Sequence, residues 1–209
     1  MPTDRSDRHA HWQNLYRARR ADAVSWFRPH LEVSLELLSA GGMSSASRVI
    51  DIGGGASTLV DDLLGRGLRH VSVLDVSEEA LAYARRRLAE RAGLVQWLAG
   101  SVLEIELSAG GFDFWHDRAM LHFLTVPADA ARYAEIAANA LGCGGCAVIG
   151  GFAPDGPERC SGLPVARRSA QQLGALFAPA FTLLQSRAER HQTPAGAEQS
   201  FAYALLQRR

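Results

Sequence analysis

Three consecutive glycines lie between a strand-like apolar run and a helical pattern near residue 50 of this 209-residue chain. The stretch, residues 48–64, reads RVIDIGGGASTLVDDLL. Glycine adopts positive φ at no steric cost and lets another molecule approach the backbone closely. A second apolar run ends at Asp75, 24 residues after Asp51. Because a carboxylate about 20 residues beyond a glycine turn binds the two hydroxyls of a ribose, this spacing predicts a nucleoside-containing ligand at the loop 53–57.

Two common nucleotide sites do not fit this pattern. In the register that starts at Gly53, the third glycine of the NAD fingerprint G-x-G-x-x-G falls on Thr58. The phosphate-binding P-loop requires a lysine, and all 22 basic residues of the chain are arginine. The absence of lysine also excludes Schiff-base chemistry and a lysine base. The remaining class is a cofactor that has a ribose and needs no pyrophosphate cradle.

Four ionisable residues gather in the stretch WHDRAMLHFL, residues 115–124. Asp117 is expected at the active-site edge, and Arg118 is expected to orient an anionic acceptor or the cofactor carboxylate. His116 or His122 is the candidate for a base that titrates near neutral pH. In the alternative interpretation, Asp117 and Arg118 cap the next helix and His122 packs in the core.

The elements that position these residues follow from the apolar periodicity. Strands are expected at 48–52, 70–75, 94–100, 112–117 and 145–152, and helices at 7–20, from Pro29, and at 57–65, from 77, 127–141 and 169–177. A last pair of strands, 181–190 and 199–207, is joined by a short turn and must be antiparallel. The alternation predicts an α/β, Rossmann-like open sheet of seven mostly parallel strands, with an antiparallel C-terminal edge pair and helices on both faces. Ligands bind such sheets at the carboxyl ends of the strands.

Two stretches, VIDIGGGAST and VSVLDVSEEAL, resemble motifs I and II of the class I S-adenosylmethionine-dependent methyltransferases. The resemblance covers residues 48–152, and the strand pattern extends it to the C-terminus. It implies that Gly53 and Gly55 lie against the methionine part of the cofactor and that Asp75 binds the ribose hydroxyls. Asp51 matches the acidic residue of motif I.

The same resemblance indicates how the adenine is held. Where the family often has an aspartate after the third strand, this chain has Ser101, a weaker uncharged partner. The amide of Val102 is the expected helper. The cofactor is then S-adenosyl-L-methionine, and the product of methyl transfer is S-adenosyl-L-homocysteine.

The stretch around Asp117 resembles the D-R-x-x-x-H-F-L pattern of small soluble methyltransferases of the tellurite-resistance and thiopurine types. This resemblance implies methyl transfer to a small molecule with a soft nucleophile, such as a thiol or a sulfide. Thiolates need little help from a base. Two alternatives stay open: a protein-lysine methyltransferase and a non-catalytic cofactor-binding module.

The N-terminal segment 1–28 is expected to form a helical lid over a methyltransferase domain that spans 29–209. Its aromatic residues Trp12, Tyr16 and Trp26 would lie beside the sulfonium of the cofactor, where cation–π attraction favours them. In the alternative, these rings only dock the helix on the sheet. Cys160 is a further candidate for the acceptor pocket.

Composition limits the partners and the location. The formal net charge is zero, which gives no electrostatic reason to expect nucleic acid or an anionic membrane as partner. Three cysteines do not make a disulfide scaffold, and Cys143-Gly-Gly-Cys146 lacks the second pair that a zinc site needs. We therefore expect no metal, a cytoplasmic location, and a monomer or a homodimer.

Overall fold

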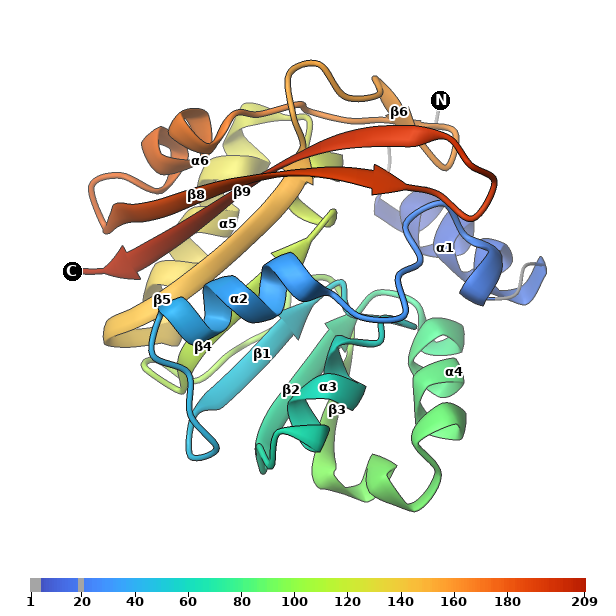
Figure 1. The fold of residues 1–209 in the computed structure, drawn as a ribbon, viewed down its shortest axis with the longest axis horizontal. Helices are drawn as coiled ribbons and strands as arrows, with labels where there is room; N and C mark the ends of the chain where they lie inside the picture. The colour runs from blue at the N-terminus through green and yellow to red at the C-terminus, as the bar shows by residue number, and fades with distance from the viewer. Residues whose placement is uncertain (1–4, 19–20) are drawn as a thin grey trace.

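The computed structural model describes residues 5–18 and 21–209. In these residues a seven-stranded sheet has the order β3-β2-β1-β4-β5-β9-β8 (Figure 1). The first five strands along the chain pair in parallel, and β9 is antiparallel to both β5 and β8. The strands are β1 (Arg48–Ile52), β2 (His70–Asp75), β3 (Val95–Ala99), β4 (Phe112–Arg118), β5 (Leu141–Phe152), β8 (Phe181–Gln192) and β9 (Glu198–Arg208). The predicted fold class is confirmed.

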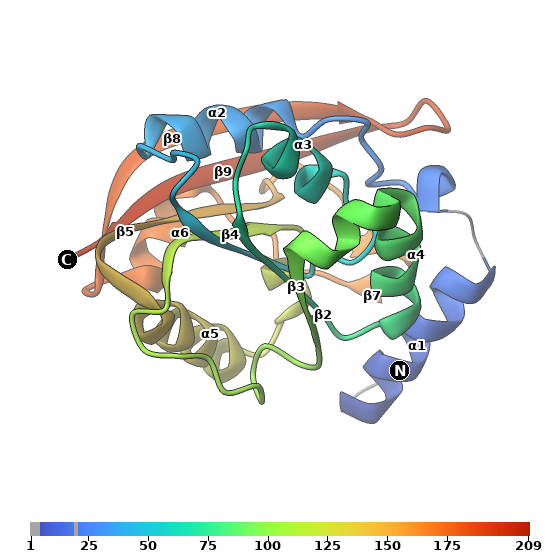
Figure 2. The ribbon, with the colours of Figure 1, turned by 90° about the horizontal axis from the view of Figure 1, so that it is seen from below.

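Helices cover both faces of the sheet (Figure 2). They are α1 (Arg5–Ala18), α2 (Glu32–Ala40), α3 (Leu59–Gly65), α4 (Glu78–Leu88), α5 (Pro127–Ala140) and α6 (Ala170–Phe177), with short 3-10 turns η1 (Ala21–Ala23), η2 (Ala89–Leu94) and η3 (Leu121–Phe123). One buried apolar cluster joins α2, α3 and α4 to one face of the sheet, and a second joins α5 and α6 to the other. No helix of the described residues is long and apolar enough to cross a membrane.

One local expectation was wrong, and one short element was not expected. Helix α2 begins at Glu32 rather than at Pro29, so that residues 29–31 remain outside the helix. The loop after β5 contains a short hairpin, β6 (Arg159–Cys160) and β7 (Leu163–Pro164). The apolar pattern of the sequence does not predict it. Both differences concern stretches of two or three residues, which are too short to show a period.

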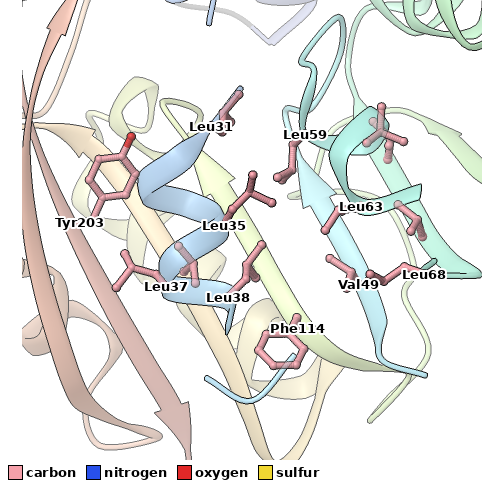
Figure 3. Close-up of a cluster of buried hydrophobic side chains, with 14 of the residues drawn as sticks. Leu31, Leu35, Leu37, Leu38, Val49, Leu59, Leu63, Leu68, Phe114 and Tyr203 are labelled. Carbon is pink, nitrogen blue, oxygen red and sulfur yellow. The ribbon is translucent and has the colours of Figure 1, made fainter. Parts of the chain in front are cut away.

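Alternation along the strands sends neighbouring side chains to opposite layers. On β1, Val49 belongs to the α2 layer and Ile50 to the α5 layer. Figure 3 shows the leucines of α2 between Tyr203 of β9 and Val49 of β1. Asp51 therefore faces the α2 layer, and the parallel register of β1 with β4 places His116 beside it. Asp117, the next residue, faces the α5 layer.

The order of the strands fixes where a ligand can bind. From β1 the chain proceeds to β2 and β3 on one side, and then returns to β4 and β5 on the other. The loop after β1 thus lies at the topological switch point, which is the usual ligand site of an open α/β sheet.

Candidate active site

A cavity of about 710 Å³ lies at the carboxyl ends of β1, β2 and β4. Its volume falls in the range of about 300–1,000 Å³ that small-molecule sites occupy. Among the sequence-predicted residues, those that line it are Asp51, Gly53, Asp75, Ser101, Val102, Trp12, Tyr16, Trp26, His116, Arg118 and Cys160. Gly55, Asp117 and His122 do not line it. The structure thus brings together most of the candidates from six separate segments.

The glycine loop lies directly on two carboxylates. A Cβ atom on Gly54 would lie 2.5 Å from Oδ2 of Asp51, and one on Gly55 would lie 2.6 Å from Oδ2 of Asp75. No side chain fits at either position without displacing an acid. Gly55 also has a φ of +38°, in the left-handed region. The run of glycines therefore allows backbone and two carboxylates to share the floor of the cavity.

Arg87 of α4 holds the far end of this loop. Its guanidinium donates to the carbonyl oxygens of Ala56 at 2.8 Å and Ser57 at 2.5 Å, and it pairs with Asp61 at 2.6 Å. Sequence reasoning missed this residue, because Arg87 is the last of three consecutive arginines and only the folded chain shows which one turns inward. Its contacts link α3, α4 and the glycine loop.

Asp75 is buried at the tip of β2, with 8% of its surface exposed. Its Oδ1 accepts a hydrogen bond from the backbone N–H of Ser77 at 2.7 Å. Burial, helped by the nearby charge of Asp51, raises the pKa of the Asp75 carboxyl to about 7, against the two backbone hydrogen bonds that lower it. These backbone donors do not offset the cost of keeping the buried carboxylate ionised, and two ribose hydroxyls would supply further donors.

Asp51 is buried beneath the glycine loop. Its Oδ1 lies 2.7 Å from Nδ1 of His116, whose Nε2 lies 2.8 Å from the hydroxyl of Ser34 on α2. The second oxygen, Oδ2, is buried without a hydrogen-bond partner among the described residues. A cofactor that brings an N–H donor to this point fits the site, because a buried carboxylate oxygen without a donor is unfavourable.

Asp117 points to the opposite face and has a different set of contacts. Its carboxylate accepts from the backbone N–H groups of Met120 at 2.8 Å and Leu121 at 3.0 Å, and from the hydroxyl of Tyr133 at 2.6 Å. Burial raises its pKa to about 6. These contacts cap the η3 turn, as in the alternative interpretation of the sequence, and they fix the chain that leaves β4 beside the cavity.

Arg118 lines the cavity, and its guanidinium is held from behind. Its Nε donates to the hydroxyl of Tyr203 at 2.9 Å, and one terminal nitrogen donates to the carbonyl of Trp26 at 2.9 Å. The other terminal nitrogen lies 3.8 Å from Glu189, and the guanidinium carbon lies 4.6 Å from the ring centroid of Phe201. Arg118 therefore fastens the segment around Trp26 to strands β8 and β9.

His122 lies behind the cavity wall, against Phe123 and Phe152. It borders a separate small cavity of about 10 Å³. Burial, together with the positive charges of Arg118 and Arg168, lowers the pKa of His122 to about 3. The imidazole is consequently neutral at physiological pH.

The N-terminal segment closes one side of the cavity with aromatic rings. The ring centroid of Trp12 lies 4.9 Å from that of Phe123 and 5.9 Å from that of Trp26, and Tyr16 lies 6.4 Å from Trp26. The side-chain oxygen of Gln13 accepts from the hydroxyl of Ser77 at 2.8 Å and from a backbone N–H of α4 at 3.1 Å. Residues 1–4 and 19–20 of the expected lid lie outside the described residues.

Comparison with known proteins agrees with this geometry. Residues 49–145 match the family described as "Methyltransferase domain". No curated protein matches the chain by sequence. The matched residues, a little under half of the chain, form a methyltransferase domain, and the enzyme is a methyltransferase with S-adenosylmethionine as its methyl donor and S-adenosylhomocysteine as the product.

Several solved structures share the fold. One is 1,6-didemethyltoxoflavin-N1-methyltransferase of Burkholderia thailandensis with its substrate and S-adenosylhomocysteine, at 22% identity over 98% of this chain and 86% of that chain, with a TM-score of 0.72. Another is the N-methyltransferase NodS of Bradyrhizobium japonicum WM9 with S-adenosylhomocysteine, at 18% identity over 94% and 97%, with a TM-score of 0.71. A third comes from work on the conversion of a disulfide bond into a thioacetal group during echinomycin biosynthesis, at 19% identity over 94% and 90%, with a TM-score of 0.76.

Proposed function

We propose that this methyltransferase acts on a small molecule, with a thiol, sulfide or other soft nucleophile as acceptor. The observation that carries the proposal is the state of the two histidines near the tip of β4. His116 is engaged by Asp51 and Ser34, and His122 lies behind the wall with a lowered pKa. Neither is placed to take a proton from an acceptor in the cavity. A thiolate reacts without such a base.

The size and lining of the cavity support a small acceptor. A volume of about 710 Å³ is enough for a cofactor and a compact second molecule. Bound S-adenosylmethionine supplies an electrophilic methyl group on its sulfonium, and the protein must align it with the acceptor and exclude water. Trp12, Tyr16 and Trp26 supply the apolar wall. We assign segment 1–28 as the lid on this basis.

The cofactor contacts follow from the positions of the two buried acids. Asp75 binds the ribose hydroxyls, and the free Oδ2 of Asp51 accepts from the α-ammonium of the methionine part. Gly53 and Gly55 shape the loop between these contacts. Ser101 and the amide of Val102, at the segment after β3, hold the adenine.

A nitrogen atom of a small heterocycle is the second candidate acceptor. An amine nitrogen with a free lone pair also reacts without a base, and the aromatic wall suits a flat ring. Two proteins of similar fold are described as N-methyltransferases, one of them with 1,6-didemethyltoxoflavin bound.

The test is a survey of acceptors with labelled S-adenosylmethionine. Thiols, sulfides, heterocyclic amines, carboxylates and lysine-containing peptides are incubated with the enzyme and separated by mass. Label in thiols or sulfides supports the first proposal, and label in heterocycles supports the second. Label in peptides alone identifies a protein methyltransferase. Cofactor binding by calorimetry without label in any acceptor identifies a binding module.

A further inference from the structure

A chain of three buried side chains connects helix α2 to the floor of the cofactor site. Ser34, His116 and Asp51 have exposed fractions of 1%, 1% and 2%. They come from α2, β4 and β1, and their hydrogen bonds measure 2.8 Å and 2.7 Å. Asp51 and His116 are register partners on adjacent parallel strands, so the backbone pairing itself brings them together.

The hydrogen bonds to Asp51 and Ser34 set which ring nitrogen of His116 carries the hydrogen when the imidazole is neutral. An ionised carboxylate only accepts, so Nδ1 of His116 carries a hydrogen and donates it to Asp51. In the neutral ring, Nε2 then accepts, and the hydroxyl of Ser34 donates to it. The partner of one ring nitrogen sets the tautomer of the other. Ser34 thereby orients His116, and His116 orients the carboxylate of Asp51.

The orientation of Asp51 matters because its two oxygens have different surroundings. Oδ1 is held by His116, whereas Oδ2 has no donor among the described residues and lies against Gly54 at the floor of the cavity. We infer that His116 and Ser34 are positioning residues, which hold Asp51 so that Oδ2 faces the amino group of the cofactor. This inference rests on the proposed cofactor contacts, and it adds the two residues that orient Asp51 for its contact with the amino group.

The inference separates two kinds of ligand. S-adenosylhomocysteine carries the amino group, whereas 5′-methylthioadenosine has the same adenine and ribose and lacks the amino-acid part. Loss of the contacts that orient Asp51 should lower the affinity for S-adenosylhomocysteine and leave the affinity for 5′-methylthioadenosine unchanged. If these hydrogen bonds only stabilised the loop, their loss would lower the affinity for both ligands, because both ligands bind against the same strands.

The experiment measures the Kd of both ligands by calorimetry for four variants. His116→Leu should raise the Kd of S-adenosylhomocysteine by about 10- to 100-fold, and Ser34→Ala should raise it by about 3- to 10-fold, which is the range of coupled buried contacts. His116→Asn keeps a donor toward Asp51 and should stay within about threefold of wild type. Ser72→Ala removes a buried hydroxyl that donates to Gln96 at 2.8 Å, away from the cavity, and serves as the control for stability.

Methylthioadenosine should bind all four variants within about twofold of wild type. Equal losses for both ligands in Ser34→Ala, or no loss for S-adenosylhomocysteine in that variant, would overturn the inference even where His116→Leu does not fold. A wild-type protein that binds neither ligand would instead refute the cofactor assignment, so the two failures are distinguishable.

Discussion

The most informative perturbation is Asp75→Asn, combined with a titration of cofactor affinity against pH. Asparagine keeps an oxygen for the backbone N–H of Ser77 and replaces the oxygen beside Gly55 with an amide group, which cannot accept from a ribose hydroxyl. A hydrogen bond to a charged group contributes about 1.5–3 kcal/mol. At pH 8 the variant should therefore bind S-adenosylhomocysteine about 10- to 150-fold more weakly than wild type.

The difference should shrink as the pH falls. The pKa of Asp75 is raised to about 7 by burial, so the free protein holds a proton there that cofactor binding must expel. At pH 6 roughly one tenth of the carboxyl is ionised, and wild-type affinity should be about tenfold below its value at pH 8. The asparagine variant has no proton to lose at this position, and its affinity should change much less.

Stability of the free protein has the opposite dependence on pH. A carboxyl whose folded pKa lies above its unfolded value binds more protons when folded, so its contribution to stability falls as the pH rises from about 4 to 7. Calorimetry from pH 6 to 8 measures the first effect, and thermal melts from pH 4 to 7 measure the second. Wild-type affinity that does not vary with pH, or an asparagine variant of wild-type affinity, would refute the assignment of Asp75 to the ribose.

Three further results are expected. Gln13→Ala should raise the KM for S-adenosylmethionine about 3- to 10-fold, because a hydrogen bond between neutral groups contributes about 1 kcal/mol and Gln13 joins α1 to Ser77 and Glu79. The exposed neighbour in Asn14→Ala is the control, and an equal KM in the two variants would show that these contacts do not hold α1 over the cavity. Tyr133→Phe should cost about 1–3 kcal/mol in a denaturant melt by leaving the carboxylate of Asp117 short of a donor, with cofactor affinity unchanged. With thiol substrates kcat/KM should rise with pH toward the pKa of each thiol, and His122→Gln should leave that profile unchanged; a profile governed by a group near pH 6.5 for every acceptor would show that a histidine base is required.

The sheet and the glycine loop at its switch point could be predicted because their signals are local. Strands β1 and β2 are short, mostly apolar runs with clear ends, and Asp75 closes the second of them. The same continuity hides the faces, since a parallel strand buried on both sides has no polar alternation. Only the register of β1 with β4 shows that His116 faces Asp51 and that Asp117 faces α5.

The partners of Arg118 and the position of His122 could not be predicted, because both depend on contacts between distant parts of the chain. The hydrogen-bond partners of Arg118 are Tyr203 and Trp26, which lie 85 and 92 residues away along the chain. The chain after β4 turns through η3, and this turn carries His122 behind the wall instead of toward the ligand. No spacing within a short window encodes either outcome.

The floor and the wall of the cavity come from different parts of the chain. The floor comes from the loops of the sheet, whereas much of the wall comes from the segment before β1, and the hairpin β6–β7 after β5 adds Cys160. Neither of these parts contributes a strand to the main sheet. Tyr16, Trp26 and Cys160 can therefore be varied together in a combinatorial library while the strand order and the two buried acids are retained. In a protein built in this way, substitution of wall residues can change the acceptor while the residues of the floor stay the same.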